Sequence, residues 1–142
     1  MKRILLSIAM VLCAVALLSA MCAAQAHHVL NPAQKTASDA LMSTGLTQLQ
    51  AAQTALQANP AQAITNLQSA VTSMRQAMPI YKGFREKAIH KATRAMRILS
   101  RINGAAGANG TRGAAKIQKA RAEVSTLIST AISDAQTALS KN

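Results

Sequence analysis

The clearest constraint on the fold is a run of apolar residues that recur at alternating steps of three and four between two prolines. The run follows Asn59-Pro60 and ends before Pro79. Its members are Ile64, Leu67, Val71, Met74 and Met78. This spacing places one apolar stripe along a helix, and such a stripe packs against the stripes of other helices. The sequence therefore predicts a helix over residues 60–78 that buries one face.

The residues at both ends of this segment agree with a helix. Asn59 can accept a hydrogen bond from a free backbone N–H group of the first helical turn, and Pro60 suits the first helical position. The residue before Pro79 avoids the helical region of backbone conformation, so the helix ends there.

Three further segments show apolar residues at helical spacing, and they predict helices over residues 33–58, 84–102 and 114–139. A connector with four glycines, 103–113, separates the last two. The residues expected to face inward are Met42, Leu46, Leu49, Ala52 and Leu56, then Ala88, Ile89, Ala92, Ala95, Met96 and Leu99, then Ile117, Ala120, Val124, Leu127, Ile128, Ala131, Ala135 and Leu139. Gly45 either weakens the first helix or marks a close contact with another helix.

Four amphipathic helices with short connections predict an all-α protein, an antiparallel up-down-up-down four-helix bundle. Half of the residues are apolar, but the chain has one tyrosine and one phenylalanine, which argues against a β-sandwich. Two alternatives stay open. The second and third helices can merge into one long kinked helix, or two chains can complete the bundle as a dimer.

The first twenty-six residues have the pattern of a secretory signal peptide. Lys2 and Arg3 precede the apolar run 4–18, and Ala24-Gln25-Ala26 offers the small residues of a cleavage site. Residues 27–32 then form an N-terminal tail. The alternative is a retained membrane anchor, for which the run is short. Because both cysteines lie in the signal, the mature chain has no disulfide. We expect an exported protein of the bacterial periplasm or the extracellular space.

Positive charge is concentrated in residues 82–121, which hold eleven basic residues against one acid, a net charge of +10 in a chain of +12. The predicted anion-binding residues are Lys91, Arg94, Arg97, Arg101, Arg112, Lys116, Lys119 and Arg121. They share one end of the bundle if the third and fourth helices are antiparallel neighbours. Such a surface suits lipopolysaccharide or phospholipid headgroups, acidic polysaccharide or nucleic acid. A solvated face that keeps the protein soluble is the alternative.

Other partners follow from the same charge and from the apolar stripes. A homodimer or an acidic protein partner fits a structural or protein-interaction module. Sequence-specific nucleic-acid binding lacks a recognisable module, and two aromatic residues offer little for base stacking.

The chain does not carry the residue patterns of common enzymes, and we expect no catalytic residue and no cofactor. The predicted mature chain has four acids, and Glu86 and His90 are not spaced as the Glu-x-x-His pairs of di-iron bundles. The glycine connector lacks the Gly-Lys-Ser/Thr ending of a phosphate-binding loop. No metal site is predicted in the bundle. A terminal His27-His28 holding copper(II) is a separate hypothesis, against the alternative of a disordered tail.

Pro79, Tyr81, Gly83 and Arg85 are predicted to build a structural turn between the second and third helices. Gly83 can adopt a backbone conformation closed to other residues. Arg85 can reach free carbonyls at the end of another helix, or Tyr81; otherwise it lies in water at the start of a helix.

Residues 79–88, Pro-Ile-Tyr-Lys-Gly-Phe-Arg-Glu-Lys-Ala, resemble a motif of small exported bacterial helical proteins rich in alanine and leucine, roughly Pro-Ile-Tyr-x-Gly-His-Arg-x-x-Ala. The resemblance covers about residues 64–99. It implies a helical bundle and carries over no catalytic residue. Phe84 stands where the group has histidine.

If residues 1–26 are a cleaved signal, the protein exported from a bacterial host should begin at His27, and its intact mass measures this. A copper(II) titration of that product then tests the terminal histidines. A protein that keeps Met1 in the membrane fraction would contradict the signal peptide. A product that begins at His27 but takes up no copper would remove the copper hypothesis.

Overall fold

A computed structural model describes residues 31–105 and 111–141. The predicted signal peptide, residues 27–30 of the predicted tail and the middle of the glycine connector lie outside these ranges. The chain divides into two units after Asn31, and the second unit holds all the helices described below.

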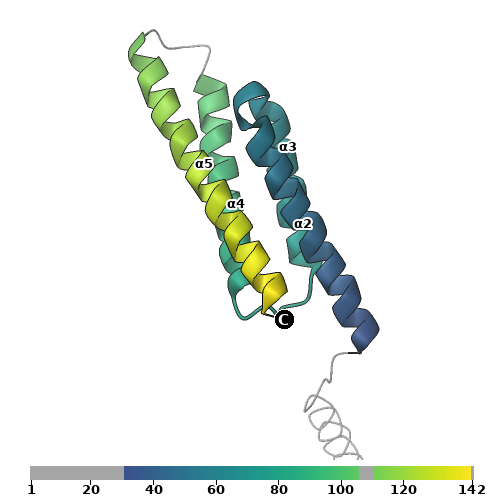
Figure 1. The fold of residues 1–142 in the computed structure, drawn as a ribbon. Coiled ribbons are helices and arrows are strands. Elements are labelled where there is room, and N and C mark those ends of the chain that lie inside the picture. Colours follow the sequence, from purple (N-terminus) through teal and green to yellow (C-terminus); the bar gives the residue numbers. More distant parts are fainter. Residues whose placement is uncertain (1–30, 106–110, 142) are drawn as a thin grey trace, which may run out of the picture. The chain divides into compact units, whose positions relative to one another are not determined.

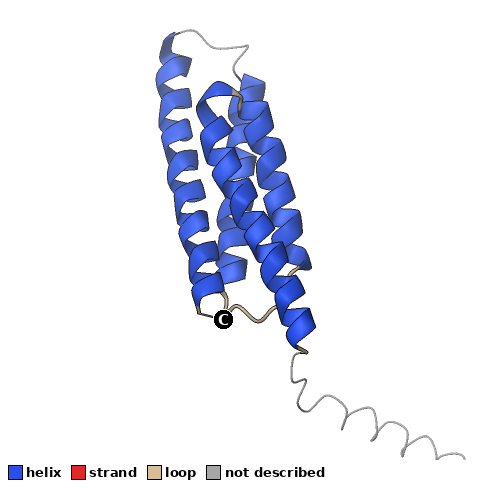
Figure 2. Ribbon diagram, turned by 45° about the vertical axis from the view of Figure 1, so that its right-hand side comes forward, coloured by secondary structure: helices blue, strands red, loops and turns tan. Residues whose placement is uncertain are grey.

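This unit consists of four helices: α2 (Pro32–Ala58), α3 (Pro60–Gln76), α4 (Phe84–Ala105) and α5 (Thr111–Ser140). No strand occurs in the ranges the structure describes. Each helix packs against the next along the chain, and α2 also packs against α5, so the four form a closed bundle (Figures 1 and 2). The predicted all-α four-helix bundle is confirmed. The alternative prediction, one long kinked helix across the second and third segments, is wrong, because α3 and α4 are separate helices that pack together.

Two helix ends differ from the sequence prediction around the connector. Helix α4 continues to Ala105 instead of residue 102, and α5 begins at Thr111 instead of residue 114. Gly104 and Gly113 are therefore helical. An isolated glycine costs a helix only about 1 kcal/mol relative to alanine, and neighbours that pack on the bundle, such as the buried Ile102, offset this. Helix α3 ends two residues early, at Gln76.

Every helix has a series of buried residues that recur in alternating steps of four and three, the repeat of interlocking helices. The series are Ser38, Met42, Gly45, Leu49, Ala52 and Leu56 in α2; Ala63, Leu67, Ala70, Met74 and Ala77 in and just after α3; Ala88, Ala92, Ala95, Leu99 and Ile102 in α4; and Val124, Ile128, Ala131, Ala135 and Ala138 in α5. Val71 of α3 is also buried, next to this series. In α2 and α3 every second member of the series is a serine, glycine or alanine.

Three of the five residues predicted for the α3 stripe, Leu67, Val71 and Met74, are buried as predicted. Ile64 and Met78, the two ends of that stripe, are only partly buried, whereas the neighbouring Ala63 and Ala77 are almost fully buried. Small side chains allow two helices to approach closely, so alanines occupy the line of closest contact and the larger side chains lie on either side of it.

Gly45 shows how close that contact is. A Cβ atom at this position would lie 2.6 Å from Met74 Cγ and 3.3 Å from the carbonyl oxygen of Ala70. Of the two interpretations of Gly45, the close helix contact is therefore confirmed.

The turn between α3 and α4 is tied to α2 by a buried hydrogen-bond chain. Ser38 Oγ accepts from the backbone N–H of Met78 at 2.8 Å and lies 2.8 Å from Tyr81 Oη. Tyr81 Oη donates to Asp39 Oδ1 at 3.1 Å, so the Ser38 hydroxyl donates to Tyr81. Burial raises the pKa of Tyr81 above its ordinary value of 10.0, which keeps the hydroxyl protonated at neutral pH.

The other turn residues act on the backbone. Gly83 has a φ of +80°, the left-handed region that favours glycine. Arg85 Nη1 donates to the carbonyl oxygen of Ala77 at the end of α3, one of the two placements expected from the sequence. At the start of α3, the Asn59 side chain accepts from the N–H of Gln62 at 3.0 Å, as predicted for a helix cap.

Substitution Gly45→Ala should lower the free energy of unfolding by about 1–2 kcal/mol, because overpacking outweighs the better helix propensity of alanine. Gly104→Ala is the matched control, since an added Cβ there meets no atom within 4 Å, and it should be neutral or stabilising by up to about 1 kcal/mol. Urea unfolding of both variants measures this. A stabilised Gly45→Ala variant would contradict the close contact.

Candidate anion-binding surface

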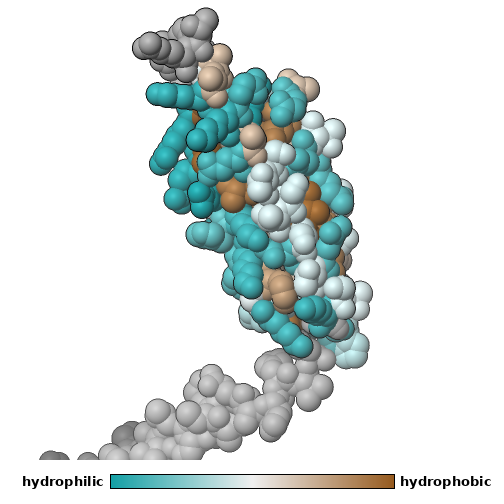
Figure 3. Space-filling model, turned by 60° about the vertical axis from the view of Figure 1, so that its left-hand side comes forward, coloured by the Kyte–Doolittle hydropathy of each residue, from teal (hydrophilic) through white to brown (hydrophobic). Residues whose placement is uncertain are grey.

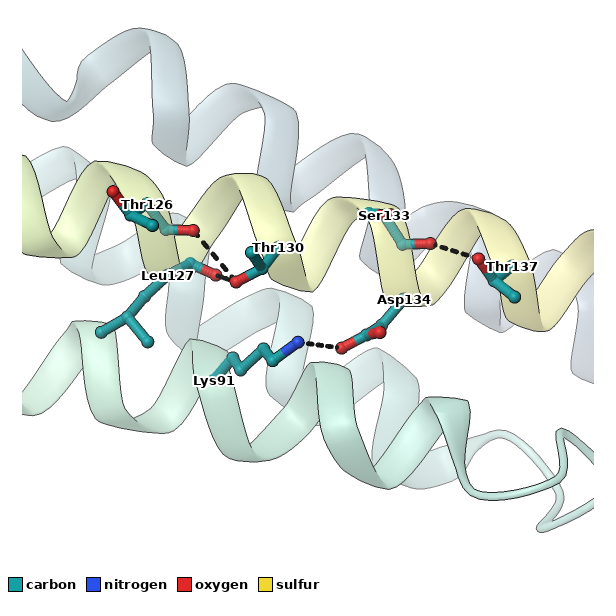
Figure 4. A network of polar contacts seen from close by, with 7 residues as sticks. All are labelled: Lys91, Thr126, Leu127, Thr130, Ser133, Asp134 and Thr137. Atoms are coloured by element: carbon teal, nitrogen blue, oxygen red, sulfur yellow. Dashed lines mark hydrogen bonds and ion pairs between the residues drawn. The ribbon is translucent and has the colours of Figure 1, made fainter.

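The predicted anion-binding residues lie on α4 and α5, which pack side by side (Figure 1). Lys91, in the first half of α4, does not belong to an open surface. Its Nζ lies 2.6 Å from Asp134 Oδ2 on α5, and the two side chains are 31% and 16% exposed (Figure 4). Lys91 is a partly buried link between two helices, and we remove it from the anion-binding set.

Arg94 lies about one turn further along α4 and pairs with Glu123 of α5 at 2.8 Å. Both side chains are about half exposed, at 60% and 48%. Exposed pairs of this kind contribute only about 0–1 kcal/mol to stability, because water screens the charges. The Arg94 guanidinium is therefore available to exchange its partner.

Arg97 and Arg101 follow on α4 at steps of three and four, so they lie on the same side of the helix as Arg94. Both are exposed, and neither forms an ion pair in the described part of the chain. An open groove of about 390 Å³ is lined by Arg94, Arg97, Ile98, Arg101 and Glu123. We call this the arginine groove.

Lys116 and Lys119 lie at the start of α5 and are exposed. They precede Glu123 by seven and four residues, so they share the side of α5 from which Glu123 reaches α4. No acidic residue among those described pairs with either lysine. They do not line the arginine groove and instead flank it.

Arg121 lies on a different side of α5. It precedes Ser125 by one turn, and Ser125 Oγ accepts from Gln53 Nε2 of α2 at 2.8 Å. Arg121 therefore faces α2, and we also remove it from the predicted set. Its Nε is buried without a hydrogen-bond partner among the described residues. Arg112 belongs to the first turn of α5, and its side chain lies outside what the structure describes.

The acidic side chains of the described residues all contact other groups than Arg97, Arg101, Lys116 and Lys119. Glu86 pairs with Arg85, Glu123 with Arg94 and Asp134 with Lys91, while Asp39 accepts from Tyr81. Arg97, Arg101, Lys116 and Lys119 thus remain without a carboxylate, at the end of α4 and the start of α5. Figure 3 shows hydrophilic side chains along the whole length of one face, with apolar side chains between them.

The chemistry of this surface is that of anion recognition. A guanidinium presents N–H groups in a planar fork that matches two oxygens of a phosphate, sulfate or carboxylate, and lysine adds a mobile point charge. The described residues contain no group of three or more His, Cys, Asp or Glu side chains placed to hold a metal ion. His27 and His28 fall outside the described ranges. None of the described helices is long and apolar enough to span a bilayer.

Comparison of the chain with models of protein families, with curated proteins and with solved structures finds no match. The resemblance of residues 79–88 to small exported helical proteins stays a prediction.

The two ion pairs between α4 and α5 should differ in their effect on stability. Asp134→Asn leaves the partly buried Lys91 without a carboxylate and should lower the free energy of unfolding by about 1–2 kcal/mol. Glu123→Gln, at the exposed pair, should change it by less than about 0.5 kcal/mol. Urea denaturation compares the two, and equal losses would contradict the description of Lys91 and Asp134 as a partly buried link between α4 and α5.

Proposed function

We propose that this chain is an exported, non-enzymatic, antiparallel up-down-up-down helical bundle that binds anionic polymers of the bacterial envelope or the extracellular space. The observation that carries the proposal is the placement of Arg97, Arg101, Lys116 and Lys119 toward the end of α4 and the start of α5, where none of them forms an ion pair among the described residues.

The register of contacts supports the antiparallel arrangement. Lys91 of α4 pairs with Asp134 of α5, whereas Arg94, which comes later in α4, pairs with Glu123, which comes earlier in α5. Ser38 at the start of α2 likewise contacts Tyr81, after the end of α3, whereas Gly45 lies against residues within α3. In both pairs of helices, a later residue on one helix meets an earlier residue on the other.

The placement of the cations favours binding over a purely solubilising role. A solubilising face works with both signs of charge interspersed, which also limits repulsion. Here Arg97, Arg101, Lys116 and Lys119 are all positive, and the first turn of α5 has no acidic residue. An anion bound across these residues would relieve their repulsion, and local rules are often broken at functional sites.

The class of ligand follows from the predicted export and from the residue types. Envelope and extracellular polymers that carry phosphate, sulfate or carboxylate groups fit a surface of arginine and lysine. The described surface offers no aromatic platform for nucleobases, since Tyr81 is buried and Phe84 lies beside the turn, with Lys87 and Lys141 each 5.1 Å from the centre of its ring.

The test is a salt titration of binding to heparin and to anionic vesicles. If four cations contact the polymer, the logarithm of the association constant should fall with the logarithm of salt concentration with a slope of about −3. The variant Lys116→Gln/Lys119→Gln should bind more weakly and with a shallower slope, by about 1.5. The control Arg75→Gln/Lys82→Gln removes the same charge from exposed positions on α3 and in the turn.

Absence of binding at low ionic strength would leave a solubilising face. Equal loss in the variant and the control would show attraction by net charge without a defined surface. Sizing of the protein alone in low and high salt tests the alternative, a homodimer: dimerisation through apolar stripes persists in high salt, whereas assembly driven by charge dissolves.

A further inference from the structure

We propose that the arginine groove is a site for a phosphate monoester or diphosphate group, and that Glu123 occupies part of this site when no ligand is bound. The inference rests on the proposed function and makes it more specific. The groove would bind one compact, doubly charged group, whereas the surrounding surface would attract anionic polymers in general.

The first support is the geometry of the three arginines. They recur at steps of three and four, so Arg94, Arg97 and Arg101 line one side of α4 over an axial distance of about 10 Å. A volume of about 390 Å³ is at the small end of known ligand sites, which span roughly 300–1,000 Å³. The groove thus has room for a phosphate or diphosphate with part of the attached group, and three guanidiniums can contact it from one side.

The second support is the Arg94–Glu123 ion pair. Glu123 Oε1 lies 2.8 Å from Arg94 Nη2, so one anion already lies at the mouth of the groove. A carboxylate carries one negative charge, whereas a phosphate monoester carries about −1.5 to −2 at pH 7. A phosphate can bridge Arg94 to Arg97 and Arg101, which have no acidic partner in the described ranges. It therefore competes with Glu123 for Arg94 and gains two further cations.

The third support is Ile98, which lies between the arginines in the lining of the groove. It offers an apolar contact for the carbon skeleton next to the phosphate. No aromatic side chain lines the groove, so a nucleobase finds no stacking partner there. This combination suits a phosphorylated sugar or glycerol better than a nucleotide. Such a phosphate group occurs both in lipid headgroups and in free solutes.

The experiment titrates the predicted mature chain with inorganic pyrophosphate by calorimetry at low ionic strength. Arg97→Gln/Arg101→Gln should weaken binding by about tenfold or more, because it removes two charge-assisted contacts. The control Arg75→Gln/Lys82→Gln lowers the net charge equally and should stay within about twofold of the original protein. The variant Arg97→Lys/Arg101→Lys keeps the charge but loses the planar guanidinium groups that can contact two phosphate oxygens at once. It should bind pyrophosphate several-fold more weakly than the original protein.

The substitution Glu123→Gln should change the affinity for pyrophosphate in the opposite direction. If Glu123 competes with the ligand, its removal should strengthen pyrophosphate binding by about threefold to tenfold. If Glu123 instead only holds Arg94 in place for the ligand, the variant should bind more weakly, which would overturn its assigned role. Circular dichroism melts of all variants check that each is folded.

A second arm uses phosphatidylcholine vesicles that contain phosphatidic acid, whose headgroup is a phosphate monoester. Loss of binding by Arg97→Gln/Arg101→Gln in this arm alone would assign the site to a lipid headgroup, and loss with pyrophosphate alone to a free solute. Loss in neither arm, while heparin binding persists, would overturn the groove as a phosphate site and leave the proposed function standing. Failure of heparin binding as well would reject both.

Discussion

Small residues at every seventh position of α2 and α3 set the spacing on which the rest of the bundle depends. Ser38, Gly45 and Ala52 alternate with larger buried residues along α2, and alanines do the same along α3. At Gly45 the two helices are so close that even a methyl group would meet Met74 and the backbone of Ala70. A core of this kind has few large side chains, so its stability depends on how closely the helices fit. The residues that flank the lines of contact then decide which helix sides face one another.

That dependence explains the division of charge between α4 and α5. Lys91 and Arg94 flank the line of contact and reach carboxylates on α5, so the middle of the pair is held by opposite charges. Closer to the connector, the basic residues beside the line of contact are Arg97 and Arg101 on α4 and Lys116 and Lys119 on α5. The packing keeps these cations near one another although they repel. The bundle thus maintains a positive surface at a cost that close packing elsewhere offsets, and an anion is the natural counterpart of such a surface.

The sequence predicted the four helices and the Asn59 cap, because each depends on spacing or on local backbone chemistry, and it left the close contact at Gly45 as one of two interpretations. It placed Ile64 and Met78 at the ends of the α3 stripe, where Ala63 and Ala77 are the buried residues, because hydrophobicity ranks isoleucine and methionine above alanine, whereas the closest contact between helices depends on size. It ended α4 too early because the weak helix preference of Gly104 is overridden by packing. The sequence could not show that Lys91 pairs with Asp134 or that Arg121 lies on the side of α5 toward α2, since both placements depend on residues that are distant in sequence.

The two ends of α4 differ in how their polar side chains are bonded. At the start of the helix, Ser38, Tyr81 and Asp39 form a continuous hydrogen-bond chain, and Arg85 satisfies both the Ala77 carbonyl and Glu86. Those residues hold the turn between α3 and α4 in place. At the other end, guanidinium and ammonium groups stand exposed without acidic partners among the described residues. Glu123, the carboxylate that lines the arginine groove, is held by Arg94, and Asp134 and Glu86 are held by Lys91 and Arg85. In the described part of the chain, exposed cations without an ion pair also occur near the turn, at Arg75 and Lys82. What distinguishes the region near the connector is that three arginines of α4 line one open groove, and the proposed anion site depends on that arrangement.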